Sequence, residues 1–310
     1  MRPTELFEKA LCGASAGICI RHDVPMSEYT SFRVGGTVPL MAIPSNEEEA
    51  ALCVKAAADS RCTALWVGNG TNLLFEDGRL DFAVIHTGQM RGIEVKGNTV
   101  EAMCGASMAA AAAAARDASL QGLEFAHGIP GSLGGGVFMN AGAYGSSLSD
   151  RVSRSLCADP SGELVCLDAG SHGFSYRHSS IMDNGYTVLR TTLELEPGDR
   201  GVIAEKMTEL RQRRQSSQPL DMPSAGSTFK RPPEGYAAAL IEQAGLKGCR
   251  LGGAQVSEKH AGFIVNRGGA TFADITGLMR LVRQRVYENS GVMLENEVQI
   301  INREGRAWNF

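Results

Sequence analysis

The stretch GIPGSLGGGVFMNAGAYG, residues 128–145, determines how the rest of the chain is interpreted. Glycine at this density destabilises a regular element, because each glycine loses much backbone entropy on folding and adds no side chain to the core. It is expected where the main chain approaches a ligand closely or turns through positive φ. Pro130, Val137, Phe138 and Met139 are untypical of a flexible linker. The stretch therefore predicts an ordered loop passing into a short buried element, with tight turns and close helix packing without a ligand as the alternative.

A second glycine loop, GNGTNLLFEDG at 68–78, follows the apolar run TALWV at 63–67, which predicts a buried strand. The loop lacks the Lys-Ser/Thr pair of a Walker loop, and its spacing is not G-x-G-x-x-G before a long helix. What remains is a nest of backbone N–H groups with Asn69, Thr71 and Asn72 beside them. Such a nest suits a diphosphate that is held and not hydrolysed.

Length and composition indicate an ordinary globular protein of two or three domains, with 310 residues, 43% hydrophobic and 21% charged. A net charge of −4 gives no general attraction to nucleic acid or to an anionic membrane. The N-terminus has no signal-peptide pattern and no apolar run reaches membrane-spanning length, so a cytosolic protein is expected. The eight cysteines form no C-x-x-C pair and are expected to be reduced, and the six histidines have no ligand spacing, so no metal is predicted.

Hydrophobic periodicity predicts helices separated by short strands up to Pro197-Gly198, and longer helices after it. Ser45 with Glu48 is a candidate capping box, Ser107 a candidate N-cap, and Gly122 a candidate helix end. Residues 24–36 are expected to be extended. Helices are predicted near 1–20, 46–59, 107–122, 200–215, 236–244 and 271–289. Strands are predicted at 63–67, within 81–103, near 152–158, 163–168 and 186–196, and at 294–301.

In combination, the motifs resemble those of the UDP-N-acetylenolpyruvoylglucosamine reductases (MurB), flavoenzymes of peptidoglycan precursor synthesis. They extend from about residue 29 to 298 and are YTSFRVGG, GNGTNLL, GLEFAHGIPGSLGGGVFMNAGAYG, FSYRHS, PSAGSTFKRP, SEKHAGFIVN and LENEV. The short spacing after FSYRHS is similar to the compact subtype without an extra tyrosine-bearing loop. Two positions depart from the pattern: many members have a basic residue at the position of Gln299 and asparagine at the position of Arg231.

The resemblance implies an α+β fold, with a two-lobed FAD-binding domain of the PCMH type followed by an α/β substrate-binding domain. Lobe 1 would span 1–60, lobe 2 would span 61–198, and the substrate-binding domain would span 199–310. The last strand is a candidate to return to lobe 1.

The resemblance also implies non-covalent FAD and NADPH as co-substrate. NADPH would reduce FAD, and hydride would then pass to the enolpyruvyl group of UDP-N-acetylglucosamine enolpyruvate, giving UDP-N-acetylmuramate. A cytoplasmic monomer acting on a small UDP-sugar is expected, with no nucleic-acid or membrane partner. The FAD-binding candidates are Arg33, Gly68, Asn69, Gly70, Thr71, Asn72, Leu73, Gly128, Ile129, Pro130, Gly131, Gly134, Gly135, Asn140, Ala141 and Gly142.

Three residues are expected to be catalytic on the family pattern. Arg177 and Glu297 would act on the substrate carboxylate, where hydride addition leaves negative charge that a guanidinium stabilises. Glu295, two residues away on the same expected strand face, is the competitor of Glu297. Ser227 would donate the completing proton with help from Lys230, although a serine in such a loop is also typical of a turn hydrogen bond.

Tyr176, Arg214 and Lys230 are the candidates for substrate binding, with Arg211 as a further helper of Arg214. Arg214 would neutralise the UDP diphosphate, whereas its alternative role is to cap the C-terminal end of a helix as a cation.

Two other functions remain open from the residues. The first is an oxidase of the same flavin-binding fold, with His127 as a conceivable covalent anchor for FAD. The second is a nucleotide sensor without catalysis, which would have no use for Arg177, Ser227 and Glu297.

Overall fold

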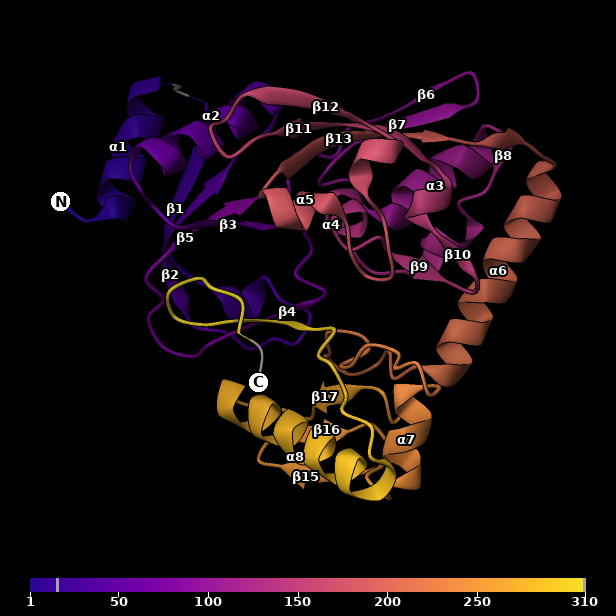
Figure 1. The fold of residues 1–310 in the computed structure, drawn as a ribbon. Helices are drawn as coiled ribbons and strands as arrows, with labels where there is room; N and C mark the ends of the chain where they lie inside the picture. The colour runs from indigo at the N-terminus through magenta and orange to yellow at the C-terminus, as the bar shows by residue number, and fades with distance from the viewer. Residues whose placement is uncertain (15–16, 309–310) are drawn as a thin grey trace. The chain divides into compact units, whose positions relative to one another are not determined.

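The computed structural model describes residues 1–14 and 17–308, which form two compact units (Figure 1). Unit 1 consists of residues 1–22, 40–69 and 82–214, and unit 2 consists of residues 23–39, 70–81 and 215–310. Strands β1 and β2 have residues in both units. The predicted domains, 1–60, 61–198 and 199–310, are each one continuous segment of the chain, whereas each of these units is assembled from three separate segments. The three-domain division stays a prediction.

The first layer of unit 1 is a four-stranded sheet in the order β1-β2-β5-β3, in which β2, β5 and β3 are parallel. Two helices, α1 (Pro3–Ala14) and α2 (Glu47–Asp59), bury Phe7, Leu11 and Cys53 in one apolar cluster with this sheet. The strands are β1 (Cys19–Pro25), β2 (Thr37–Ile43), β3 (Ala64–Val67) and β5 (Ala83–His86).

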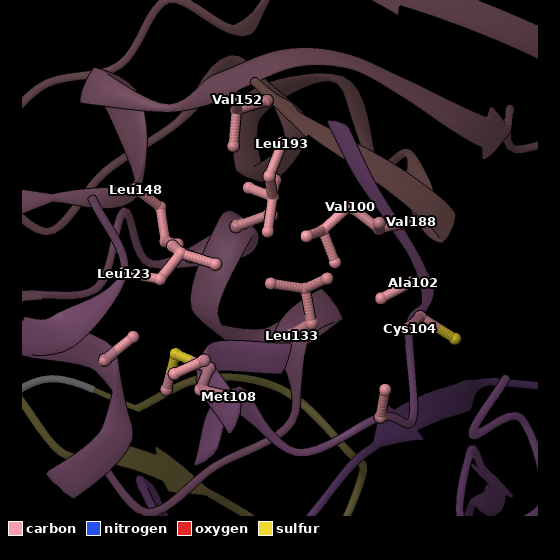
Figure 2. Close-up of a cluster of buried hydrophobic side chains, with 14 of the residues drawn as sticks. Val100, Ala102, Cys104, Met108, Leu123, Leu133, Leu148, Val152, Val188 and Leu193 are labelled. Atoms are coloured by element: carbon pink, nitrogen blue, oxygen red, sulfur yellow. The ribbon is translucent and has the colours of Figure 1, made fainter. Parts of the chain in front are cut away.

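The second layer of unit 1 is a five-stranded antiparallel sheet in the order β12-β11-β13-β7-β6. Its core packs Val100 and Leu193 of the sheet against Met108 and Leu133, which come from two different helices (Figure 2). The strands are β6 (Ile93–Lys96), β7 (Thr99–Met103), β11 (Val152–Ala158), β12 (Leu164–Asp168) and β13 (Thr187–Glu194). The helices are α3 (Met108–Asp117), α4 (Leu133–Phe138), α5 (Ser180–Asn184) and α6 (Arg200–Ser217).

Smaller elements complete unit 1 around the glycine-rich run. They are β8 (Leu120–Gln121) paired with β14 (Glu196–Pro197), β9 (Gly142–Ala143) paired with β10 (Ser146–Ser147), and the 3-10 turns η2 (Glu124–Gly128), η3 (Leu148–Asp150) and η4 (Gly170–His172).

Unit 2 is built on helix α8 (Phe272–Ser290), which packs on a small antiparallel sheet, β15-β16-β17. Its buried face contributes Ile275, Leu278, Met279 and Val282 to the core. A parallel pair, β4 (Leu73–Phe75) with β18 (Gln299–Ile301), completes the unit. The other elements are η1 (Met26–Glu28), α7 (Ala237–Gln243), β15 (Arg250–Leu251), β16 (Ala254–Val256) and β17 (Ile264–Asn266).

The α+β class is confirmed, as are the predicted helices after residue 200 and the strands of the antiparallel sheet. Ser107 caps α3 as expected, since its side chain accepts from Ala110 N. The expected return of the last strand to residues 1–60 is wrong, because β18 pairs with β4 at residues 73–75.

Several predicted boundaries are wrong for local reasons. The helix expected over 1–20 ends at Ala14, and residues 19–25 form β1. The N-cap of α2 is Asn46, whose side chain accepts from Glu49 N at 2.9 Å, so the Ser45–Glu48 capping box is displaced. Helix α3 ends at Asp117, before Gly122, because Ser119 takes a left-handed φ of 58°.

Two segments expected to be extended are mostly irregular. Within 24–36 the strand ends at Pro25 and a 3-10 turn follows. Within 294–301 only 299–301 is strand, although Asn296 forms an isolated bridge with Phe229. The expectation that Glu295 and Glu297 share a strand face is therefore wrong.

Among the described residues, no helix combines the length and apolar character needed to cross a membrane. The same residues contain no cluster of three or more His, Cys, Asp or Glu side chains suited to a metal ion. All eight cysteines are free thiols, of which Cys53, Cys62, Cys104 and Cys157 are buried and Cys12, Cys19 and Cys166 exposed.

Candidate functional site

The glycine-rich run forms an ordered loop that enters the short helix α4, as predicted. Two of the helix glycines are required by packing. A Cβ at Gly134 would lie 2.7 Å from Cys104 Cβ, and one at Gly136 would lie 2.8 Å from Met108 Sδ. Both contacts are closer than real Cβ atoms show. At Gly134 the main chain of Cys104 is also within 3.2 Å, so a side chain would push the helix off the core, whereas at Gly136 the ends of the Met108 and Leu148 side chains would have to move.

Gly135, between them, has no such packing reason. Its residue surface is exposed, and a Cβ there would meet only Ser132 Oγ at 3.3 Å. Glycine in a helix interior costs about 0.5–1 kcal/mol relative to alanine. A glycine that weakens a helix without packing against the protein is expected where a ligand approaches the main chain. The face of α4 that carries Gly135 is therefore the part of the run suited to a ligand.

The start of the second glycine loop lies beside α4 in unit 1. Gly68 follows β3, and a Cβ there would overlap Ser132 Oγ, the N-cap hydroxyl of α4. Two buried polar atoms of unit 1, Thr87 Oγ1 and His127 Nδ1, have no hydrogen-bond partner among the described residues, and His127 directly precedes the glycine-rich run. Thr87 Oγ1 lies 3.7 Å from the Gly68 Cβ position. Unpartnered polar atoms beside glycine loops fit a polar ligand such as a diphosphate-linked cofactor.

The remainder of that loop, from Gly70, belongs to unit 2 and is held by the protein itself. Gly70 has φ 59°, and a Cβ would overlap the main-chain oxygen of Tyr29. Asn72 Nδ2 donates to Glu297 O at 3.1 Å, and Gln299 N donates to Asn72 O at 3.0 Å. Asn72 thus ties the loop to the segment that carries Glu297, while Thr71 stays half-buried, Leu73 begins β4 and Arg33 is exposed.

Unit 2 also brings Ser227 and Glu297 onto neighbouring segments. Thr228 O accepts from Glu297 N at 2.9 Å, and Lys230 N donates to Glu295 O at 2.8 Å. Ser227 and Glu297 are both half-buried. The Glu295 side chain is 75% exposed and its carboxylate lies 3.5 Å from Lys230 Nζ. Of the two glutamates, Glu297 is the one withdrawn from solvent, and Glu295 is the one paired with Lys230.

Arg177 belongs to unit 1, in a turn held against the glycine-rich run. It has a left-handed φ of 56°, its Nη2 donates to Gly142 O at 3.4 Å, and its guanidinium lies 5.1 Å from the Tyr176 ring centroid. Asn140, expected only as a cofactor contact, donates through Nδ2 to Ser175 O, and Ser179 Oγ donates to Phe138 O. The positions of Asn140 and Ser179 opposite this turn could not be found from the sequence, because neither contact is local.

Arg214 lies at the end of α6 in unit 1, where its Nη1 donates to Gly128 O. Its Nε is buried with no hydrogen-bond partner among the described residues. Lys230, which is expected to help Arg214 bind the substrate, is in unit 2. Arg231, which differs from the residue that many family members have, lies with its guanidinium 4.2 Å from the centroid of the Tyr236 ring. Arg214 therefore contacts the glycine-rich run through the main-chain oxygen of Gly128.

Comparison with known proteins gives one consistent family. Residues 38–168 match the family described as FAD binding domain, and residues 218–301 match UDP-N-acetylenolpyruvoylglucosamine reductase, C-terminal domain. A UDP-N-acetylenolpyruvoylglucosamine reductase of Caldanaerobacter subterraneus is 43% identical over 89% of this chain and 92% of its own. One of Limosilactobacillus reuteri is 45% identical over 92% of this chain and 96% of its own.

Among solved structures, the MurB crystal structure from Thermus caldophilus is similar, with TM-score 0.79 and 32% identity over 91% of this chain and 99% of that one.

Proposed function

Because this chain belongs to the UDP-N-acetylenolpyruvoylglucosamine reductase family, we propose that it reduces UDP-N-acetylglucosamine enolpyruvate to UDP-N-acetylmuramate. FAD is the cofactor, NADPH the reductant, and peptidoglycan precursor synthesis the process. The proposal places the enzyme in the cytoplasm as a monomer without nucleic-acid or membrane partners. The oxidase and the nucleotide sensor are not retained, since relatives covering nine-tenths of the chain are reductases.

The exposed helix glycine Gly135 is the observation that carries the cofactor site. It lies in the segment that matches an FAD-binding family, and it leaves the α4 main chain exposed where a Cβ would meet only Ser132 Oγ. Gly68 and the unpartnered Thr87 hydroxyl lie beside the same helix. The residues present in unit 1 therefore fit FAD, with the main chain at Gly68 and Gly135 as its principal contacts.

When bound, FAD supplies hydride transfer from NADPH to the enolpyruvyl group. The chain's residues manage charge and proton. The guanidinium of Arg177 stabilises the negative charge that develops next to the substrate carboxylate, because planar paired donors match a carboxylate. Ser227 Oγ–H donates the proton that completes the product, and Glu297 helps to polarise the substrate carboxylate as a protonated acid or through a bridging water. Tyr176, Arg214 and Lys230 bind the remainder of the substrate.

Replacing Gly135 with leucine tests the cofactor site. The reference variant is Gly13→Leu in α1, another helix glycine, where a Cβ would meet nothing within 4 Å, whereas a Cβ at Gly135 would meet only Ser132 Oγ at 3.3 Å. Gly135→Leu should fold and unfold at the temperature of the control but retain at least about tenfold less FAD, a loss of ~1.4 kcal/mol or more in binding free energy. Flavin absorbance per protein after gel filtration measures this. Full FAD occupancy in folded Gly135→Leu would remove α4 from the cofactor site.

A further inference from the structure

Three hydrogen bonds hold the turn that carries Arg177 against the glycine-rich run, and we call this set the 138–142 clamp. Ser179 Oγ donates to Phe138 O at 2.8 Å, and Asn140 Nδ2 donates to Ser175 O at 3.0 Å. Arg177 Nη2 donates to Gly142 O at 3.4 Å. Alternate residues of the run, 138, 140 and 142, thus each bind one residue of 175–179.

The turn held by the clamp has an unfavourable backbone conformation. Ser175 and His178 exchange main-chain hydrogen bonds of 3.1 and 3.3 Å, which leaves Tyr176 and Arg177 at the tip. Arg177 has φ 56°, a left-handed conformation that is unfavourable for a non-glycine residue. Such conformations persist when the surroundings over-determine them, and here the clamp does so.

Asn140 is fully engaged in this role. It is 7% exposed, its Oδ1 accepts from Ser149 N at 3.0 Å, and its Nδ2 is the donor to Ser175 O. Its own φ of 43° is one that asparagine tolerates better than most residues. The side chain therefore joins the run to the turn, with both of its polar atoms hydrogen-bonded to the protein.

Ser179 gives up a local interaction to complete the clamp. It is the N-cap residue of α5 and is 0% exposed, yet its side chain makes no capping hydrogen bond. A serine N-cap usually accepts a hydrogen bond from the first turn of its own helix, which stabilises the helix. Here the hydroxyl lies against Phe138 O, 41 residues away in the chain.

We propose that Asn140 and Ser179 are positioning residues that fix the guanidinium of Arg177 for the substrate carboxylate. This inference rests on the proposed role of Arg177. Because a displacement of a catalytic group by about 1 Å can cost about a hundredfold in rate, loss of one clamp bond should lower turnover while the fold remains.

The test compares Asn140→Asp and Ser179→Ala with Arg177→Ala. Aspartate preserves the size of the side chain, the acceptor for Ser149 N and the tolerance of positive φ, but removes the donor to Ser175 O. Ser60→Ala, which also deletes a buried hydroxyl-to-carbonyl hydrogen bond, is the control for general stability loss. Each protein is assayed for FAD content, flavin reduction by NADPH, flavin reoxidation by substrate, and calorimetric affinity for UDP-N-acetylmuramate.

Both clamp variants should keep FAD and its reduction rate, reoxidise about 10- to 100-fold more slowly, and bind product more weakly. In a protein that already carries Arg177→Ala, adding Asn140→Asp should slow reoxidation by less than about a further threefold, because the two residues act as one unit. Loss of FAD from Asn140→Asp with unchanged reoxidation of the remaining holoenzyme would overturn the inference and make Asn140 a cofactor contact.

Unchanged reoxidation and product affinity in both clamp variants, with Arg177→Ala impaired, would also overturn the inference and leave the proposed function intact. An Arg177→Ala variant as active as the wild type would instead remove the role of Arg177 on which the inference rests.

Discussion

Ser227 and its neighbour Thr228 differ in how far the protein already uses their hydroxyl groups. Thr228 is 1% exposed and its Oγ1 accepts from Ile264 N at 3.0 Å. Its main chain binds Gly262 and Glu297. Thr228 is therefore a structural residue, and its contacts fix the position of the neighbouring, half-buried Ser227. An alanine at Thr228 would leave Ile264 N unsatisfied and cost stability, so Ser224 is the better comparison for Ser227.

Ser227→Ala should bind FAD and be reduced by NADPH at the wild-type rate. Its reoxidation by substrate should be slower by about a hundredfold or more, because a positioned general acid contributes roughly 10² to 10⁴ in rate. Stopped-flow reoxidation measures the difference, with Ser224→Ala as control. A reoxidation rate within about threefold of wild type would leave Ser227 with the turn role only.

Glu297 and Glu295 are distinguished by their surroundings. Glu297→Gln should lower turnover by about a hundredfold or more, since Glu297 is half-buried and its main chain binds Thr228, the residue next to Ser227. Glu295→Gln should change turnover by less than about threefold, because an exposed ion pair such as that with Lys230 contributes at most about 1 kcal/mol. Steady-state kinetics measure the turnover of both variants. A larger loss of turnover in Glu295→Gln than in Glu297→Gln would assign the catalytic role to Glu295.

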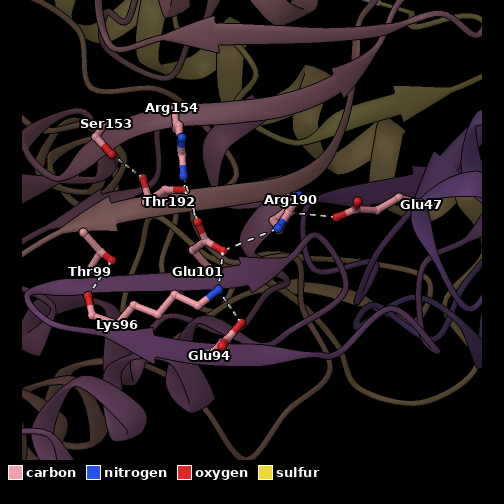
Figure 3. Close-up of polar contacts among 9 residues, drawn as sticks. All are labelled: Glu47, Glu94, Lys96, Thr99, Glu101, Ser153, Arg154, Arg190 and Thr192. Carbon is pink, nitrogen blue, oxygen red and sulfur yellow. Dashed lines mark hydrogen bonds and ion pairs between the residues drawn. The ribbon is translucent and has the colours of Figure 1, made fainter.

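At the scale of elements, an ion-pair network crosses the five-stranded sheet of unit 1 (Figure 3). Glu101 on β7 binds Arg154 of β11 at 3.0 Å and Arg190 of β13 at 3.4 Å, and Lys96 of β6 lies 3.7 Å away. Arg190 also binds Glu47 at the start of α2 at 2.9 Å. A single carboxylate thus links its own strand to three others and, through Arg190, to helix α2 of the first layer.

The network predicts a pH dependence of stability. Burial raises the pKa of Glu101, but the hydrogen bond from Arg154 and the charges of Lys96 and Arg190 outweigh it and lower the pKa. A carboxyl group whose pKa is lower in the folded state than in the unfolded state stabilises the fold fully at pH values above its unfolded-state pKa, about 4.3. This stabilisation is lost as the pH falls through the lowered, folded-state pKa.

The unfolding temperature of the wild type should therefore fall as pH decreases below about 4.3, and Glu101→Gln should lose less over the same range. Thermal unfolding followed by circular dichroism between neutral and acidic pH measures this. Glu94→Gln is the control, because the Glu94 side chain is 62% exposed. An identical acid dependence in wild type and Glu101→Gln would show that the network does not contribute.

At the scale of the whole molecule, cofactor binding and folding are linked. A ligand that binds only the folded state stabilises it by about 2.7 kcal/mol at a hundredfold excess over its dissociation constant. The family implies FAD held without a covalent bond, and His127, the one residue suggested as an anchor, has a buried Nδ1 without a partner among the described residues.

Acid precipitation of the purified yellow protein should therefore leave the flavin in the supernatant, and removing FAD under mild conditions should lower the unfolding temperature, with recovery on adding FAD back. Absorbance of supernatant and pellet, together with thermal unfolding, measures both. Flavin that stays with the pellet would point to a covalent bond, and His127→Ala would then show whether His127 forms it.

The sequence alone predicted what depends on local pattern. Apolar periodicity indicates the helices after residue 200, and the Ser107 cap follows from a residue type that competes well for the first-turn N–H groups. The density of glycine at 128–145 predicted an ordered loop and a short buried element, because glycine has few other uses at that frequency. The order of motifs indicated the family, since their combination extends over almost the whole chain.

Only the tertiary structure decided which glycine of α4 is open and which are packed, because the neighbours Cys104 and Met108 come from other elements. It also decided that Asn72 binds Glu297, 225 residues away, and that Asn140 holds the Arg177 turn. Positive φ at a non-glycine residue costs energy that local sequence does not reward, so it forms only where distant hydrogen bonds over-determine it. Local pattern therefore determined the elements, and packing determined which side chains remain for the substrate.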